Sequence, residues 1–220
     1  MAVARGTGKF KMEMKLEWQG EVAAVQPRIR LLRSFDQRSH NYLGYLLRIQ
    51  GNLGQERREF MVAIGKAAQA KHQFRTSDKA AGKGEAVADP RLETADLYKV
   101  SKLKLLSRTD DPFPPSPPFL GVPPDLMIYR ERGHRRLDPK TFEAKCKTCM
   151  WGCEMPVEMI VDQWNPSAKK YRLETFCYGP KSCPVYKSGP VRTVPGRKGM
   201  SWKEEDWVDE QATAHRGPDD

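Results

Sequence analysis

The chain has 220 residues, 39% of them hydrophobic, and its 38 Lys and Arg against 28 Asp and Glu give a formal net charge of +10. This length suits one or two domains, and the charge indicates a polyanionic partner, with a solubilising surface as the alternative. No apolar stretch reaches the ~20 residues of a membrane span, and residues 1–8 lack the apolar run of a signal peptide. We therefore expect a cytoplasmic protein whose cysteines lie in a reducing compartment.

Residues 10–108 are predicted to form a small closed β-barrel after a flexible arm at residues 1–9. Apolar and polar side chains alternate from Phe10 to Gln19, which indicates a half-buried strand that bends at Gly20 and continues to Arg33. Further strands are predicted at 43–49, 60–64 and 98–106, with a basic loop at 74–84 and almost no helix. This pattern resembles an oligonucleotide/oligosaccharide-binding (OB) barrel, and other small barrels and Ig-like sandwiches are the alternatives.

Residues 109–139 are predicted to be a proline-rich linker followed by a basic segment. The run from Asp110 to Asp125 is dense in proline, which excludes helix and central strand and favours a stiff, extended spacer between two lobes. Its P-x-x-P spacings make a docking site for a proline-recognising domain the alternative.

Residues 140–188 contain all five cysteines. Cys146 and Cys149 form a C-x2-C pair, Cys177 and Cys183 form a C-x5-C pair, and a β-hairpin with its turn at 165–168 is predicted between the pairs. A hairpin can bring both pairs to one point. Zinc bound there by four thiolates would stabilise a lobe that is too small to be stable through burial of apolar surface alone. This arrangement resembles a zinc ribbon.

The zinc ligands we expect are Cys146, Cys149, Cys177 and Cys183, with Cys153 as an alternative ligand. The C-x2-C-x3-C run that ends at Cys153 also suits an iron–sulfur cluster. Reduced core thiols or a disulfide are the remaining alternatives.

Residues 189–220 are predicted to be a loop and an acidic, tryptophan-containing tail. Ser201 and Glu204 have capping-box spacing, which predicts a short helix over 202–211. Trp202 and Trp207 are candidate partner-binding residues. Because the tail is acidic and the first lobe is basic, we also consider that the tail lies in a basic groove of that lobe and competes with nucleic acid.

The sequence favours a binding protein over an enzyme. It contains no nucleophile elbow, phosphate-binding glycine loop or H-E-x-x-H motif, and a zinc ion with four thiolates has no open position for catalysis. We therefore expect no catalytic residues.

Nucleic-acid binding is the function we expect, through charge neutralisation and base stacking on single-stranded DNA or RNA with little sequence specificity. The candidate contacts are cationic and aromatic residues of the first lobe: Arg28, Arg30, Arg33, Arg38, Tyr42, Arg48, Arg57, Arg58, Lys71, Phe74, Arg75, Lys79 and Lys83. The alternative is an adaptor or accessory subunit of a larger protein or ribonucleoprotein assembly. A third hypothesis is a protein that handles acyl carriers, because those proteins also combine a barrel with a ribbon.

Overall fold

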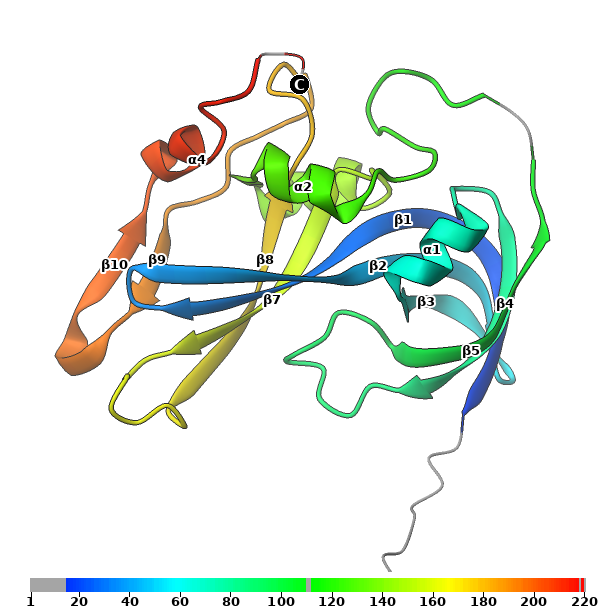
Figure 1. The fold of residues 1–220 in the computed structure, drawn as a ribbon, viewed down its shortest axis with the longest axis horizontal. Helices are drawn as coiled ribbons and strands as arrows, with labels where there is room; N and C mark the ends of the chain where they lie inside the picture. Colours follow the sequence, from blue (N-terminus) through cyan, green and yellow to red (C-terminus); the bar gives the residue numbers. More distant parts are fainter. Residues whose placement is uncertain (1–14, 110–111, 218, 220) are drawn as a thin grey trace, which may run out of the picture.

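The protein is described by a computed structural model that covers residues 15–109, 112–217 and 219 (Figure 1). The fold is mainly β, as predicted: eight strands form one mixed sheet in the order β2-β3-β5-β4-β1-β7-β8-β6, and two form a separate hairpin. Within the described ranges, no helix is long and apolar enough to cross a membrane. The expected arm at residues 1–9 and the start of the first strand at Phe10 lie outside the described residues.

Two long strands cross the molecule and organise the sheet. Strand β1 (Leu16–Ser34) pairs antiparallel with β2 (Gln37–Leu53) along its whole length, and β2 pairs in turn with β3 (Glu56–Ile64). Figure 1 shows β1 and β2 running from the rounded end of the molecule to the opposite end, beside the C-terminal hairpin.

The rounded end is a ring of five strands. The first residues of β1, 16–21, pair with β4 (Lys79–Ala86), and from residue 18 onward β1 also pairs with β2 on its other edge. Strand β4 pairs with β5 (Leu97–Ser107), and a short parallel contact between Val62 and Leu97 joins β5 to β3. The ring order is therefore β1-β2-β3-β5-β4, with helix α1 (Lys66–His72) between β3 and β4.

The ring encloses apolar side chains that alternate with polar ones along the strands, among them Val22, Leu47, Ile49 and Phe60, each no more than 1% exposed. Gly20, where the sequence predicts a bend, lies directly opposite Gly51 of β2. A Cβ atom on Gly51 would lie 2.2 Å from the Gln19 carbonyl oxygen, so β1 and β2 approach too closely here for any side chain.

The hairpin predicted between the two cysteine pairs is present as β7 (Gly152–Ile160) and β8 (Lys169–Cys177). It does not stand apart from the barrel, because β7 pairs in parallel with residues 31–34 of β1. Gln26 of β1 adds a second connection, since its buried amide donates hydrogen bonds to the carbonyl oxygens of Cys146 (3.2 Å) and Cys149 (2.8 Å).

The proline-rich segment packs against both parts instead of serving only as a spacer. The Pro124 carbonyl oxygen accepts a hydrogen bond from the Tyr45 hydroxyl of β2 (2.9 Å), and the Phe119 carbonyl oxygen accepts one from the Met150 amide (2.9 Å). Four short elements follow this segment: α2 (Leu126–Arg132), β6 (Arg135–Arg136), α3 (Pro139–Thr141) and the π-helical turn η1 (Phe142–Cys146).

The C-terminal region folds onto the far ends of β1 and β8. It contains the hairpin of β9 (Arg192–Pro195) and β10 (Ser201–Glu204), the 3-10 turn η2 (Arg197–Gly199) and helix α4 (Asp206–Ala212). The short helix is therefore present, but the capping-box prediction is wrong. Ser201 begins β10, and the helix starts after Glu205.

Two predictions about the first half were also wrong. Residues 79–84, expected within a basic loop, belong to β4, because antiparallel pairing with both β1 and β5 compensates for a sequence of Lys, Ala, Gly and Glu with low strand propensity. Residues 66–72, for which no helix was expected, form α1.

Candidate functional site

A basic groove runs over the ring where β1 contacts both β2 and β4. It consists of two adjoining depressions of about 400 Å³ and about 300 Å³, which share Gln19 and Asn52 in their walls. Strands β1, β2, β3, β4 and β5 all contribute to the lining. We use the name basic groove for the surface formed by residues 17–21, 50–52, 54, 57, 79, 81–83, 102 and 104.

Cations outnumber carboxylates in this groove. Its cationic residues are Arg57, Lys79, Lys83, Lys102 and Lys104, and its acidic residues are Glu17 and Glu21. Lys83 forms an ion pair with Glu17, and this hydrogen-bonded contact, with a smaller effect of Lys102, lowers the pKa of the Glu17 carboxyl. Arg57, Lys79 and Lys104 are exposed and form no ion pair with any described residue, so they are available to an anionic ligand.

Trp18 lies at the wall of the groove, but its ring is only 3% exposed. Its indole N–H has no hydrogen-bond partner among the described residues. Gly82 lies against this ring, and a Cβ atom there would be 2.9 Å from it. The groove therefore offers lysines and side-chain amides to a ligand, and it does not offer a freely exposed aromatic face.

Three of the predicted contacts, Arg57, Lys79 and Lys83, are brought together in the basic groove. The candidate list missed Lys102 and Lys104, which line the same groove. Their signal was the alternation of Lys with apolar residues in β5, which predicts one outward-facing row of lysines.

Two predicted contacts are buried, and we withdraw them. Arg33 is 2% exposed and binds the carboxylates of Glu174 (2.9 Å) and Glu204. Phe74 is completely buried in the core, although the sequence placed it in an exposed loop. Neither side chain can reach a ligand at the surface.

The other predicted contacts lie outside the groove, and most of them are engaged within the protein. Arg28 pairs with Glu93, Arg48 with Glu59, Arg58 with Asp96 and Arg38 with Glu204, while Arg30 donates to the Leu92 carbonyl and Arg75 to that of Thr109. Tyr42 is half-buried beneath Arg130, whose guanidinium carbon is 5.0 Å from the ring centroid. Lys71 is exposed on α1.

The four predicted zinc ligands line one small cavity, together with Phe119, Leu137 and Tyr186. The cavity volume is about 10 Å³, the size of a single water molecule or ion. Cys146, Cys149 and Cys177 are each 6% exposed, Cys183 is more exposed, and none of them forms a disulfide.

Burial is the main cause of the raised pKa values of the Cys146, Cys149 and Cys177 thiols. The pKa of Cys146 is about 12, and the thiols of Cys177, Cys149 and Cys183 contribute to that rise. Burial also raises the pKa of Cys149 to about 11, against the effect of backbone hydrogen bonds from Trp151, Phe119 and Gly152. The Gly179 amide donates a hydrogen bond to Cys177 Sγ (3.3 Å).

Cys153, the alternative ligand, does not line this cavity. It is completely buried in the core that the hairpin shares with the barrel, and its thiol is 3.4 Å from the Pro27 carbonyl oxygen. In the part of the chain that the structure describes, no three His, Cys, Asp or Glu side chains are gathered closely enough to hold a metal ion. The four thiols line one cavity, but they are not close enough to one another to form a metal site among the described residues.

The tail lies against arginines of the first lobe, but at the opposite end of β1 from the groove. Glu204 of β10 binds Arg33 and Arg38, and Asp209 of α4 binds Arg136 at 2.9 Å. Trp202 packs on Phe35 (centroid distance 6.4 Å) and on Trp207 (6.0 Å), which is 47% exposed. The described residues of the tail do not line the basic groove.

Comparison with known proteins adds no further assignment. No protein-family model matches the chain, and searches of curated proteins and of solved structures also found no match.

Proposed function

We propose that this protein is a non-catalytic nucleic-acid-binding protein whose basic groove binds the backbone of single-stranded DNA or RNA. The observation that carries the proposal is the concentration of five cations against two carboxylates in one groove, with Arg57, Lys79 and Lys104 forming no ion pair with any residue that the structure describes. The ring order, with a helix between its third and fourth strands, supports the resemblance to an OB barrel.

Charge neutralisation is the mechanism that these residues favour. Among the described residues, a phosphate that binds Lys104 or Arg57 displaces no ion-pair partner, whereas binding to a paired arginine would first break an ion pair. Gln19, Gln50 and Asn52 add hydrogen-bonding amides along the same walls. Because the groove presents no exposed aromatic ring, stacking contributes little there, and recognition is largely independent of sequence.

The experiment is a fluorescence anisotropy titration with a labelled mixed-sequence single strand at several salt concentrations. Each phosphate contact on a single strand contributes about −0.7 to the slope of log K against log salt. Four or five contacts therefore give a slope of about −3. Absence of binding at low salt, or affinity independent of salt, would overturn the proposal.

We also propose that Cys146, Cys149, Cys177 and Cys183 hold a structural zinc ion. Four thiols are the donor set of structural zinc sites, and the cavity that they line has room for one ion and not for an iron–sulfur cluster. Zinc would tie the start of β7 to the end of β8. Metal analysis should find about one zinc per chain. Purified protein that contains no zinc, and whose unfolding is the same with and without a chelator, would refute the site.

A second candidate function is an accessory subunit of a larger protein or ribonucleoprotein assembly. The observation in its favour is the exposed Trp207, which lies beside Trp202 on the C-terminal surface. A protein that co-purifies in stoichiometric amount with wild type and is lost from Trp207→Ala would support this function.

A further inference from the structure

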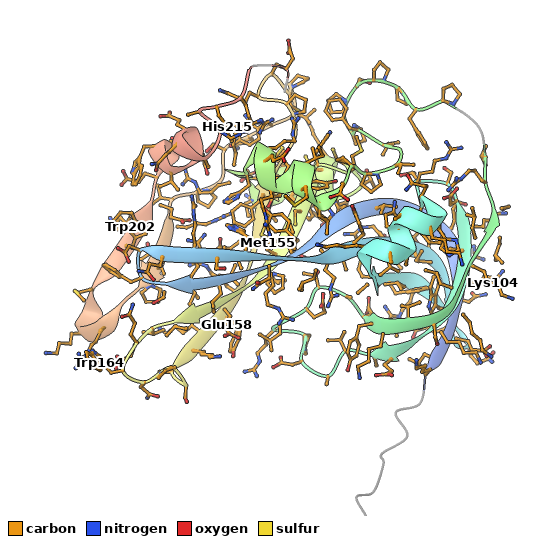
Figure 2. All side chains as sticks on the ribbon, in the orientation of Figure 1. Lys104, Met155, Glu158, Trp164, Trp202 and His215 are labelled. Atoms are coloured by element: carbon orange, nitrogen blue, oxygen red, sulfur yellow. The ribbon has the colours of Figure 1, made fainter. Side chains whose placement is uncertain are left out.

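Trp164 has the highest exposed fraction, 79%, of the large apolar side chains on the described surface. It lies in the turn between β7 and β8, and Figure 2 shows it at the end of the molecule opposite Lys104. A large aromatic ring left in water is a feature of binding surfaces, because burying it against a partner is strongly favourable.

The turn that carries Trp164 is held by hydrogen bonds. The Trp164 amide donates to Asp162 Oδ1 (3.0 Å), and the Asn165 amide donates to the Asp162 carbonyl oxygen (3.1 Å). The Gln163 side chain donates to Ser34 Oγ at the end of β1 (3.1 Å). The ring therefore lies on an ordered turn, and ligand binding would not carry the entropic cost of ordering the backbone of this turn.

One cationic residue lies beside the ring, and two further cationic residues are exposed on neighbouring segments. Arg197, from the turn between β9 and β10, has its guanidinium carbon 5.9 Å from the Trp164 ring centroid and lies 4.0 Å from Asp162. Lys198 follows it in the same turn, and Lys170 lies near the start of β8, both of them exposed. An exposed aromatic ring beside cations suits a nucleobase together with its phosphate.

We propose that Trp164 is a stacking platform for an unpaired base, with Arg197 beside it to contact the adjoining phosphate. This inference rests on the proposed function, because it takes nucleic acid to be the ligand. The basic groove and Trp164 then bind two parts of one strand at opposite ends of the molecule. A strand long enough to reach both sites binds more tightly than a short one, through the high effective concentration of the second contact.

The test compares Trp164→Ala, Trp164→Phe and the control Trp207→Ala, which removes another exposed tryptophan away from this turn. Affinities are measured for single strands of graded length and for a duplex. Trp164→Ala should weaken binding of long single strands about tenfold, while Trp164→Phe retains part of the affinity and Trp207→Ala has no effect. Duplex binding should change little, because paired bases are already stacked.

The outcomes separate this inference from the proposed function. If Trp164→Ala and wild type bind all lengths equally while Lys102→Glu/Lys104→Glu abolishes binding, the stacking platform is refuted and the groove stands. If wild type binds no oligonucleotide, both proposals fail. A length threshold that is present in wild type and lost in Trp164→Ala would support the platform directly.

Discussion

The two ends of β1 use cationic residues in opposite ways. At its beginning, residues 17–21 border a groove in which Arg57, Lys79 and Lys104 are exposed and unpaired among the described residues. At its end, Arg33 is buried between Glu174 and Glu204, and Arg38 also binds Glu204. One end presents positive charge to a ligand, and the other uses it to attach the C-terminal region.

This difference shows that local charge does not identify a binding surface. Arg57 lies close to Glu56 and Glu59 in the sequence but forms no ion pair with a described residue, whereas Arg33 is paired with carboxylates 141 and 171 residues later in the chain. Burial acts to raise the pKa of the Glu204 carboxyl, but the hydrogen bond and charge of Arg33 outweigh it and hold that pKa below its usual value. Pairing across the fold decides which cations remain available.

The largest expected effect is on stability at the tail end. Arg33→Ala would leave the carboxylates of Glu174 and Glu204 buried with only part of their partners, and we expect the free energy of unfolding to fall by about 3–5 kcal/mol. Denaturant unfolding followed by tryptophan fluorescence measures it. Arg57→Ala is the control and should change stability by less than about 0.5 kcal/mol. Equal effects of the two variants would remove the distinction between the two ends.

A pH dependence should appear at the same end. His40 and His134 lie with ring centroids 4.6 Å apart. Burial, reinforced by the charges of Arg38 and Arg33, lowers the pKa of His40 from 6.5 to about 4, and burial also lowers the pKa of His134, with contributions from His40, Arg38 and Arg192. Between pH 6.5 and about pH 4, His40 therefore binds a proton more readily in the unfolded state than in the folded state.

The stability contributed by neutral His40 is complete above pH 6.5 and is lost as the pH falls toward about 4. The total loss should be up to about 3 kcal/mol. Across this range, the free energy of unfolding should fall less steeply with decreasing pH for His40→Asn than for wild type. The carboxyl of Glu204 adds to the loss in the lower part of this range, because folding lowers its pKa from 4.5, and His40→Asn leaves that contribution in place. Identical profiles would contradict the assignment to His40.

At the groove, the expected effect is on binding. Lys102→Glu/Lys104→Glu replaces two cations in the wall with anions, and we expect affinity for a single strand at low salt to fall about ten- to a hundredfold. Lys140→Glu/Lys187→Glu, at exposed sites away from the groove, makes the same change in net charge and should have a much smaller effect. Equal losses would show that total charge matters and the groove does not.

The smallest expected effect is that of a single groove cation. Arg57→Ala should weaken binding by a few-fold and make the salt slope shallower by about 0.7, the contribution of one phosphate contact on a single strand. A salt titration of wild type and variant measures both quantities. An unchanged slope with weaker binding would mean that Arg57 acts through the structure of the groove and not by contacting phosphate.

Much of the fold could be predicted from local pattern. The alternation in residues 16–33, 43–49, 60–64 and 98–106 identified strands, and the turn chemistry at 165–168 identified the hairpin of β7 and β8. Strand β4 could not be recognised in this way, because its residues have low strand propensity and its pairing partners lie up to 68 residues before it in the sequence. The parallel contact of β1 with β7, which joins hairpin to barrel, is also invisible to local pattern.

The sequence predicted which types of residue form the candidate site, but it did not predict where on the fold the site lies. The sequence indicated a basic first half, and three of its predicted contacts line the groove. It also assigned Arg33 and Phe74 to the surface, because alternation reveals neither the distant carboxylates that bind Arg33 nor the burial of Phe74 in the core, where the His72 ring at the end of α1 stacks on it. Cys146, Cys149, Cys177 and Cys183 line one cavity, but among the described residues they are not gathered closely enough to hold a metal ion, so their role as zinc ligands stays a prediction.

The most direct test of the basic groove as the interface is lysine footprinting by mass spectrometry. The protein is acetylated with and without an excess of single-stranded oligonucleotide, and the reactivity of each lysine is compared. We predict that Lys79, Lys83, Lys102 and Lys104 become protected while Lys140 and Lys187 react as before. Unchanged reactivity of the four groove lysines with an oligonucleotide that binds would contradict the account.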